Sequence, residues 1–370
     1  MSRPLLAPVA SWSSVHHPCG HSRSILARRE YDGPTMRPLA INASILGPTP
    51  SGLGQYALGL LRALDPLREG LVVYTSCPGA LAGLRATMRR ISPITRPELG
   101  VGGHVARLLW CQTVLRARVG LDRPGALLNT LPEGVLRCRV PQVTVVHDLI
   151  PLAFPRDYPR QQLYFRRLVQ AILRESRAVV AVSEAARRAV IAAYGLGPER
   201  VRAIPNGYDA AEFVPIGPAT DDGGVPYVLY VGNLLPHKNL PRLIEAVARV
   251  ARQSPVRLII AGGGTPGRVG ELRRLADRVG ARLELMPYVA QRALPALYRG
   301  ARLLAMPSLA EGFGLPASRR WPAAPPSSSA TRPRCRRSWA TRDCSSIQRT
   351  RTPSRTPSCV CSPRIRCARS

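Results

Sequence analysis

The loop at residues 232–239 is the strongest candidate site; it begins at Gly232-Asn233 and ends at Lys238-Asn239. It follows an apolar run that predicts a strand and precedes a predicted helix. Ligands of open parallel sheets bind at such strand ends, and the first N–H groups of a helix are free to bind an anion. Lys238 is the only lysine of the chain, and its ammonium group could neutralise a diphosphate. The alternative is an ordinary strand–helix loop with a solvated lysine.

A second candidate is the segment 306–316, in which Glu311 stands beside Gly312-Phe313-Gly314. A carboxylate between a strand end and a glycine-flanked aromatic side chain could accept hydrogen bonds from sugar hydroxyls. The alternative is a solvated acid on a surface loop.

Three further motifs come at predicted strand ends or turns. Gly263 lies in a three-glycine turn, which allows a ligand to approach the backbone closely but also simply makes a tight turn. Gly52 and Gly54 lie in the first half of the chain. They would face the crevice of Lys238 and Glu311 from the opposite domain. His147 could position an acceptor hydroxyl or stabilise charge at a reacting carbon, although a lone histidine can equally be structural.

The elements that must position these residues alternate between strand and helix. Apolar runs predict strands at 38–46, 71–74, 143–146, 178–182, 201–204, 227–231, 258–261, 283–286 and 303–306. Helical patterns separate them, and Ser183 is placed as the N-cap of a helix over 184–194. Such repeated units predict parallel sheets covered on both faces. We therefore expect two doubly wound α/β domains, at 36–215 and 216–316, the second with four strands.

Composition sets limits on the class of protein. A length of 370 residues suits two domains, and the hydrophobic content of 45% excludes a wholly disordered chain. No apolar run approaches the roughly 18 residues that span a bilayer, and the first thirty residues lack a secretory apolar core. Nine cysteines in no regular array do not indicate a disulfide framework. A cytoplasmic protein is expected.

The two ends differ from the rest of the chain. Residues 1–35 are expected to be a disordered extension or a mis-assigned start ahead of Met36; a metal site at His16, His17, Cys19 and His21 is the alternative. Residues 317–370 hold 13 Arg and one acid, a net charge of +12 within the chain's +31, so residues 1–316 carry +19. The arginine excess has two alternative explanations. It follows from GC-rich codons, or it provides a basic surface that binds anionic lipid headgroups or nucleic acid.

The motifs together resemble the family-4 glycosyltransferases, the retaining group with the GT-B fold. They occur in family order over about residues 37–316: Gly52-Leu-Gly54-Gln-Tyr56, His147-Asp148, Val182-Ser183, Pro205-Asn206-Gly207-Tyr-Asp209, Gly232…His237-Lys238-Asn239 and Pro307-Ser308…Glu311-Gly312-Phe313-Gly314-Leu315-Pro316. The resemblance implies two Rossmann-like domains around a nucleotide-diphosphate sugar that is held mostly by the second domain.

The resemblance also implies the roles of individual residues. Lys238 would bind the diphosphate and stabilise the leaving group, and Glu311 would contact the donor sugar. Gly52 and Gly54 would lie near the phosphates, and His147 near the reacting sugar. No metal or other cofactor is expected, because in this family basic residues and helix dipoles stabilise the negative charge of the diphosphate in place of a metal ion.

Two departures from the family pattern stand out. Asn233 occupies a position where many members have an arginine, and Arg319 occupies that of the family's second glutamate, eight residues after Glu311. We interpret residues 317–370 as the out-of-frame translation of a normal C-terminal half, because Ser, Cys and Trp codons there become apolar codons in the shifted frame. The alternative is a genuine basic tail.

The expected function is transfer of a hexose, with retention, to a hydroxyl of a glycan, a lipid-linked acceptor or a small molecule. Mannosyl transfer in polysaccharide biosynthesis, with peripheral contact to an anionic inner membrane face, fits this class. Loss of the C-terminal part would leave the printed chain weakly active or inactive. The competing hypotheses are a non-catalytic protein that binds nucleic acid through its arginine-rich tail, and a GT-B phosphorylase or epimerase.

Overall fold

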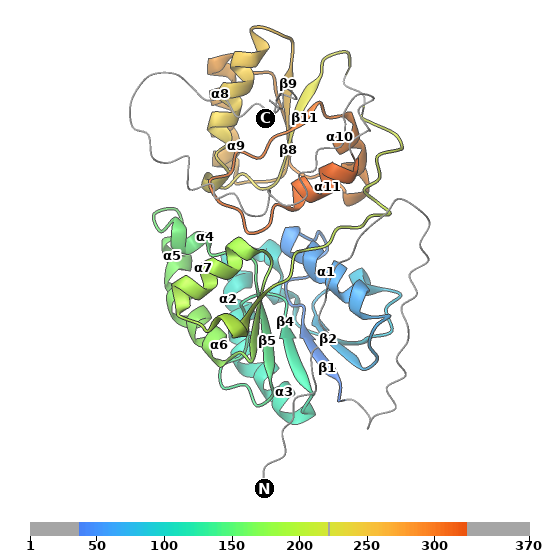
Figure 1. Cartoon of the computed structure of the whole chain (residues 1–370), viewed down its shortest axis with the longest axis vertical. Helices are drawn as coiled ribbons and strands as arrows, with labels where there is room; N and C mark the ends of the chain where they lie inside the picture. Colours follow the sequence, from blue (N-terminus) through green and yellow to red (C-terminus); the bar gives the residue numbers. More distant parts are fainter. Residues whose placement is uncertain (1–36, 221–222, 324–370) are drawn as a thin grey trace, which may run out of the picture. The chain divides into compact units, whose positions relative to one another are not determined.

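The computed structural model describes residues 37–220 and 223–323. These residues form two parallel β-sheets with helices packed against them (Figure 1). The predictions for residues 1–35, including the histidine–cysteine group, lie outside the described residues, as do those for the tail beyond residue 323.

The first sheet has seven parallel strands in the order β3-β2-β1-β4-β5-β6-β7. Their bounds are β1 Leu39–Asn42, β2 Leu71–Thr75, β3 Thr87–Arg90, β4 Ala126–Asn129, β5 Gln142–Val146, β6 Ala178–Ala181 and β7 Val201–Ala203. The order reverses between β1 and β4: β1 leads through α1 to β2 on one side, whereas β4 leads to β5 on the other. This is the topological switch point of a doubly wound sheet.

The helices of this part are α1 Gly52–Leu64, α2 Gly100–Trp110, α3 Arg116–Asp122, α4 Ile150–Ala153, α5 Pro159–Tyr164, α6 Gln170–Glu175 and α7 Glu184–Tyr194. A π-helical turn at Cys111–Leu115 joins α2 to α3, and another at Phe165–Val169 joins α5 to α6. The Ser183 hydroxyl accepts a hydrogen bond from Ala186 N–H, so the predicted N-cap of α7 is confirmed.

The second sheet has four parallel strands in the order β10-β9-β8-β11, with its switch point between β8 and β11. The strands are β8 Tyr227–Val231, β9 Arg257–Ala261, β10 Leu283–Met286 and β11 Leu303–Leu304. The helices are α8 Leu240–Ala251, α9 Pro266–Val279, α10 Leu294–Gly300 and α11 Leu315–Ala323. The predicted fold class and the four-stranded second sheet are confirmed in the described residues.

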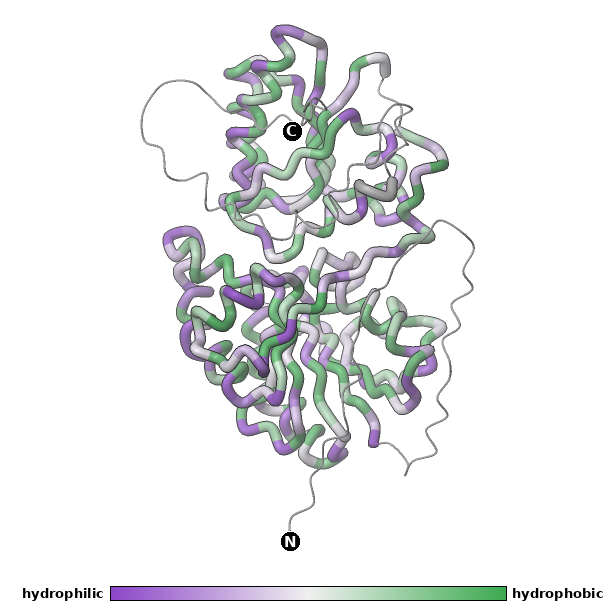
Figure 2. The backbone as a smooth tube through the Cα atoms, viewed as in Figure 1, coloured by the Kyte–Doolittle hydropathy of each residue, from purple (hydrophilic) through white to green (hydrophobic). Residues whose placement is uncertain are grey.

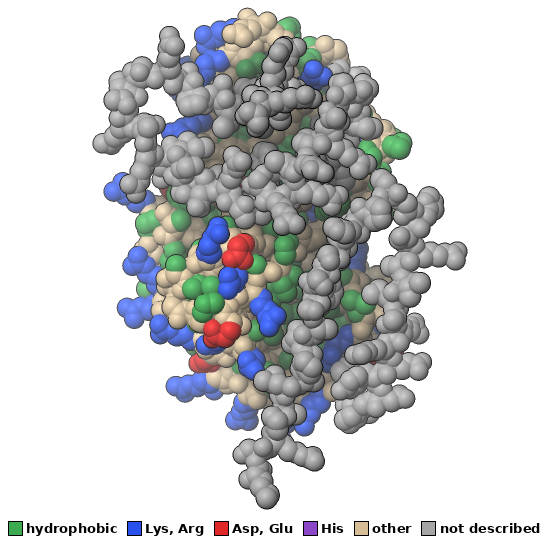
Figure 3. Space-filling view, in the orientation of Figure 1, with side chains coloured by type: hydrophobic (Ala, Val, Ile, Leu, Met, Phe, Trp, Pro, Cys, Tyr) green, Lys and Arg blue, Asp and Glu red, His purple; other side chains and the backbone are tan. Residues whose placement is uncertain are grey.

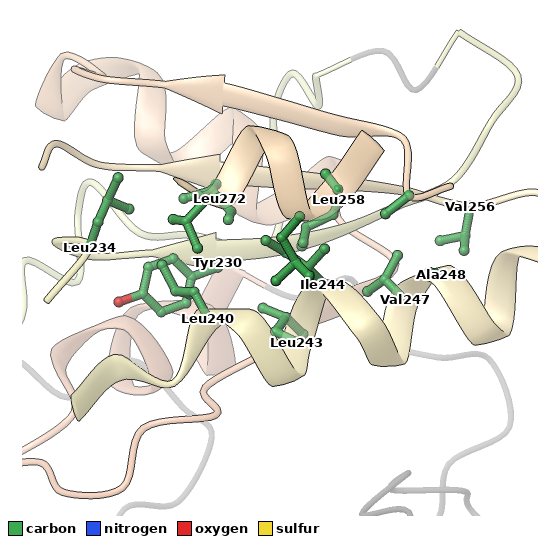
Figure 4. Close-up of a cluster of buried hydrophobic side chains, with 14 residues drawn as sticks. Tyr230, Leu234, Leu240, Leu243, Ile244, Val247, Ala248, Val256, Leu258 and Leu272 are labelled. Atoms are coloured by element: carbon green, nitrogen blue, oxygen red, sulfur yellow. The ribbon is translucent and has the colours of Figure 1, made fainter. Parts of the chain in front are cut away.

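The second sheet has a hydrophobic cluster on each of its two faces, and helices cover both clusters. Successive residues of a strand point to opposite sides, so Tyr227 and Leu229 pack toward α10 while Tyr230 packs toward α8 and α9. Figure 4 shows the second of these layers, in which side chains of α8 meet those of β8, β9 and α9. Hydrophobic residues run along the strands in the tube view, whereas the outer helices carry many hydrophilic ones (Figure 2).

Some predicted bounds were wrong. The first strand ends at Asn42 rather than 46, because the chain turns at Ser44 and Ile45, where Leu46 N–H donates to the carbonyl of Ala43. Strands β3 and β4 were not predicted. Helix α11 continues through residue 323, although the predicted break in pattern lies at Pro316.

Candidate active site

The loops that carry Lys238 and Glu311 meet at the switch point of the second sheet. Lys238 follows β8 and Glu311 follows β11, and these two strands are neighbours in the sheet. Loops that diverge from the carboxyl ends of such strands open a crevice, which is where open α/β sheets bind ligands. The topology therefore brings together two residues that are 73 positions apart in the chain.

Lys238 and Glu311 form an ion pair. The Lys238 ammonium Nζ donates a hydrogen bond of 2.6 Å to Glu311 Oε1, and the Ser308 hydroxyl donates a second bond of 2.6 Å to the same oxygen. The Lys238 side chain is 14% exposed and that of Glu311 is 30% exposed. Within the described residues, no hydrogen bond reaches the other carboxylate oxygen, Oε2. A ligand can therefore find one cation and one open acceptor side by side.

Two hydrogen bonds to backbone carbonyls fix the two loops on each other, one from the Asn239 side-chain amide and one from a backbone N–H. Asn239 adopts a left-handed conformation (φ 56°) at the start of α8, and its amide donates to the carbonyl of Pro307 at 3.1 Å. The N–H of Leu309 donates to the carbonyl of His237 at 2.8 Å. These bonds hold the loop of Glu311 against that of Lys238 without using either charged side chain.

Glycines at the ends of β8 and β9 keep this edge of the sheet free of side chains. Gly232 (φ 151°) and Gly262 (φ 155°) adopt conformations that favour glycine. A Cβ at Gly262 would overlap the carbonyl of Gly232, so the two backbones pass in direct contact. Asn233 contributes its carbonyl, which accepts from the Tyr230 hydroxyl at 2.8 Å, and the carbonyl of Gly263 accepts from Leu234 N–H. The three-glycine turn was selected from the sequence with Gly263 as its candidate residue; the close approach of Gly262 to Gly232 was not predicted.

His147 follows β5 in the first sheet, and its ring is held from two sides. Its Nε2 lies 2.9 Å from the carbonyl oxygen of Thr130, and the ring of Tyr56 stands edge-on at a centroid distance of 4.6 Å. Since a carbonyl can only accept, Nε2 carries the hydrogen and Nδ1 keeps its lone pair in the neutral ring. Burial lowers the pKa of His147, which favours this neutral form although the bond to Thr130 opposes the shift. Neither Thr130 nor Tyr56 was predicted as a support of His147.

The backbone after Glu311 packs directly against residues of the first sheet. Gly312 lies so close to His147 that an added Cβ would overlap the histidine's carbonyl oxygen. The Ser183 hydroxyl donates to the carbonyl of Gly312 at 2.6 Å. These contacts connect the loop of Glu311 with His147.

A tyrosine–histidine contact beside Lys238 was also missed. The Tyr158 hydroxyl lies 2.7 Å from Nδ1 of His237, which is almost fully buried. Burial lowers the pKa of His237, and the neighbouring Lys238 charge lowers it further. Burial raises the pKa of Asp148, while the charges of His237 and Lys238 oppose that rise. No sequence pattern pointed to Tyr158, because it comes from a stretch without regular period.

The other predicted residues are placed as follows. Gly52 begins α1 with open space around it, and Gly54, in the same turn, is buried against Pro50. Phe313 is half-buried, and Gly314 (φ 86°) supplies a carbonyl that accepts from Ala317 N–H at the start of α11.

Arg319 stands where the family pattern has its second glutamate. Its guanidinium carbon lies 5.0 Å from the centroid of the Phe213 ring, and its buried Nε has no hydrogen-bond partner in the described part of the chain. Burial lowers the pKa of this guanidinium. The position therefore holds a half-buried cation that stacks on an aromatic ring.

Comparison with known proteins gives two consecutive family matches. Residues 50–212 match Glycosyltransferase Family 4, and residues 218–318 match Glycosyl transferases group 1. D-inositol 3-phosphate glycosyltransferase of Kineococcus radiotolerans is 32% identical over 163 residues, which are 40% of this chain and 38% of the relative. O-antigen chain mannosyltransferase B of Escherichia coli is 27% identical over 186 residues, 47% of this chain and 49% of the relative. The chain spans about half the length, or less, of these relatives.

The fold is found among solved structures as well. An E. coli structure described as trehalose-6-phosphate bound with UDP-2-fluoro glucose superposes with a TM-score of 0.57, at 14% identity over 78% of this chain and 82% of that one. At this identity the likeness concerns the fold alone. The two family matches thus support a family-4-like glycosyltransferase, and this likeness supports the GT-B fold.

Proposed function

We propose that this protein binds a nucleotide-diphosphate sugar and transfers its hexose, with retention, to a hydroxyl group. The observation that carries the proposal is the Lys238–Glu311 pair at the switch point of the second sheet. It offers a cation for a diphosphate and a carboxylate for sugar hydroxyls within one loop pair.

Lys238 and the start of α8 would stabilise the leaving group. The bond between the sugar's C1 and the diphosphate oxygen breaks, and negative charge gathers on the β-phosphate. An ammonium group aimed at developing charge lowers the barrier, and the free N–H groups of a helix start act in the same sense. Because no cation other than the protein's own is needed, we propose no metal.

Glu311 and His147 would hold the sugar and the acceptor. Glu311 Oε2 has room to accept a hydrogen bond from a donor hydroxyl. The packing of Gly312 on His147 brings the histidine's backbone to the same loop, and its neutral ring offers Nδ1 as an acceptor. The acceptor hydroxyl would attack C1 from the face that the diphosphate leaves and pass its proton to the departing phosphate oxygen, so the configuration is retained.

The acceptor class and the setting are part of the proposal. One relative is named for an O-antigen chain and mannose, and another for an inositol phosphate, so we propose a hexose such as mannose and a glycan, lipid-linked or small polar acceptor. Among the described residues, no helix is long and apolar enough to cross a membrane. We propose a cytoplasmic enzyme in peripheral contact with an anionic membrane. The nucleic-acid alternative depends on tail residues beyond 323, outside the described part.

Titration calorimetry with UDP-glucose, UDP-galactose, GDP-mannose and ADP-glucose tests this proposal. One donor is expected to bind, and Lys238→Ala should weaken it roughly 10- to 150-fold, the value of a charge-assisted hydrogen bond of about 1.5–3 kcal/mol. Arg242→Ala is the matched control, because it removes one exposed cation from the first turns of α8. Equal losses in both variants would contradict the assignment of Lys238. Binding of no donor at all would contradict the function.

A further inference from the structure

Buried polar side chains are concentrated beside His147 in the first sheet. Six of them form one hydrogen-bonded network across the neighbouring strands β1, β4 and β5, and each is at most 4% exposed. They are Asn42, Asn129, Thr130, Glu133, Gln142 and Thr144. In the described part of the second sheet, tyrosines apart, strands β8–β11 contribute no buried polar or charged side chain. The network is therefore particular to the first sheet.

Side-chain amides of this region take the place of backbone pairing for the loop after β4. Gln142 Nε2 donates to the carbonyl of Val135 at 2.8 Å, and Gln142 Oε1 accepts from Val135 N–H at 3.2 Å. Gln112, on the π-helical turn, likewise donates to the carbonyl just before Val135 and accepts from the N–H just after it, at 2.8 and 3.0 Å. Because an amide side chain both donates and accepts, these contacts give the loop one defined path.

Glu133 anchors the middle of this loop. Its carboxylate accepts a hydrogen bond from Arg107 Nε at 2.8 Å, and its backbone carbonyl accepts one from Asn42 Nδ2 at 2.9 Å. Many charged side chains lie at the molecular surface, as the face in Figure 3 illustrates, whereas Arg107 and Glu133 are both buried. Separating a buried ion pair is costly, so the pair resists any displacement of the loop.

Thr130 connects the network to His147. The Thr130 hydroxyl donates to the carbonyl of Asn42 at 2.8 Å, and the Thr130 carbonyl lies 2.9 Å from Nε2 of His147. A neutral imidazole has two tautomers, and the hydrogen bond made by one ring nitrogen decides which nitrogen carries the hydrogen. A carbonyl held in place at Nε2 therefore keeps Nδ1 free of hydrogen and sets the orientation of the ring.

Stability alone does not account for the network. None of its six residues has a buried side-chain nitrogen or oxygen without a hydrogen-bond partner. Replacing both partners of such a bond by apolar groups of the same shape is nearly neutral or even stabilising. What a fully bonded buried network adds is a rigid and unique geometry. The residue of the candidate site that receives this geometry is His147, through the carbonyl of Thr130.

We propose that Asn42, Thr130 and Glu133 are positioning residues for His147. They fix its tautomer and its orientation, so that Nδ1 accepts a hydrogen bond from a hydroxyl of the donor hexose. None of the three touches the substrate. This inference rests on the proposed transfer of a hexose and names the residues that prepare His147 for it.

Nitrogen NMR of the histidine side chains in the full chain, together with calorimetry, tests this role. The signals of His147 are assigned by comparison with His147→Asn. The wild type should carry the hydrogen at Nε2 alone, whereas Thr130→Val should show both tautomers. Thr130→Val should also weaken binding of the sugar nucleotide roughly 2- to 12-fold, the value of one neutral hydrogen bond, and leave that of the nucleoside diphosphate unchanged.

Two further variants separate positioning from stability. Thr130→Ser keeps the hydroxyl and should retain the wild-type tautomer, with an affinity within about twofold of the wild type. Thr144→Val removes another buried hydroxyl of the network, which bonds to Asn129 and Ser176 instead of Thr130. It should lower the midpoint of urea unfolding but leave the tautomer and the donor affinity unchanged. Thr130→Ala, which adds no bulk, replaces Thr130→Val if circular dichroism shows that the valine variant is unfolded.

Each of three results would overturn the proposal. A single Nε2 tautomer in Thr130→Val would show that His147 does not depend on the network. Equal losses for both ligands, or equal losses in Thr130→Val and Thr144→Val, would reduce the network to a structural role. A changed tautomer with unchanged affinity would remove Nδ1 from donor binding. If the wild type binds no donor, the proposed function fails, whereas the tautomer in Thr130→Val still reports whether the network holds His147.

Discussion

Replacing Glu311 by glutamine should make the protein bind a nucleoside diphosphate more tightly. In the free protein Glu311 neutralises Lys238 through a bond of 2.6 Å. A diphosphate that takes over the ammonium group must first displace this carboxylate. The variant Glu311→Gln removes that competitor, so the cost of displacement disappears from the binding free energy.

The size of the effect follows from the exposure of the pair. An exposed ion pair is worth about 0–1 kcal/mol, and removing one partner of a buried pair costs about 3–5 kcal/mol. Lys238 is 14% and Glu311 30% exposed, which places the coupling between these limits, at about 1–2 kcal/mol. Affinity for the nucleoside diphosphate should therefore rise roughly 5- to 30-fold.

The matching sugar nucleotide should not gain in the same way. In the proposed complex its hexose uses Glu311 as a charged acceptor, and loss of such a hydrogen bond costs about 1.5–3 kcal/mol. Titration calorimetry of the diphosphate and the sugar diphosphate on both proteins gives the two changes. Glu271→Gln is the control, because it removes an acid that pairs with Arg268 instead. Weaker diphosphate binding by Glu311→Gln would refute the reasoning.

Three further predictions concern the supports of the site. Gly312→Ala should lower donor affinity at least tenfold, measured by calorimetry, because its Cβ would overlap the carbonyl of His147; Gly267→Ala, with open space around it, should not. Burial lowers the pKa of His147, so the unfolded chain binds a proton more readily; stability should fall as pH drops through about 6.5, and His147→Asn should flatten that part of a denaturation profile. Burial of Glu133 acts to raise its pKa, but His104 and Arg107 lower it overall; Glu133→Gln should cost about 3–5 kcal/mol in urea unfolding at pH 7 and less as the wild type is acidified.

The sequence predicted those parts of the fold that depend on uninterrupted apolar strands. Strands such as β8 and β9 are buried on both faces, so their apolar runs stand out from polar surroundings. Strand β3 was missed because it lies at an edge and reads Thr-Met-Arg-Arg, with little apolar pattern. The helix α2–α3 was missed because it is apolar on two sides and begins among three glycines, which hides a helical period.

Some residues of the candidate site were likewise selected from the sequence, whereas the contacts between them were not. Lys238 and Glu311 were predicted because each follows a strand end in a loop of unusual composition, and parallel topology brings strand ends to one edge. Their direct pairing was not predicted, since it depends on the register of β8 beside β11. Tyr158 could not be predicted, because its contact with His237 joins segments 79 residues apart that share no motif.

The central claim, that Lys238 binds the diphosphate of a sugar nucleotide, is tested most directly by comparing a nucleoside diphosphate with its monophosphate. Calorimetry on the wild type and on Lys238→Ala gives four dissociation constants. The account predicts that the diphosphate binds at least tenfold more tightly than the monophosphate in the wild type, and that this advantage nearly disappears in the variant. An unchanged advantage in Lys238→Ala would contradict the account.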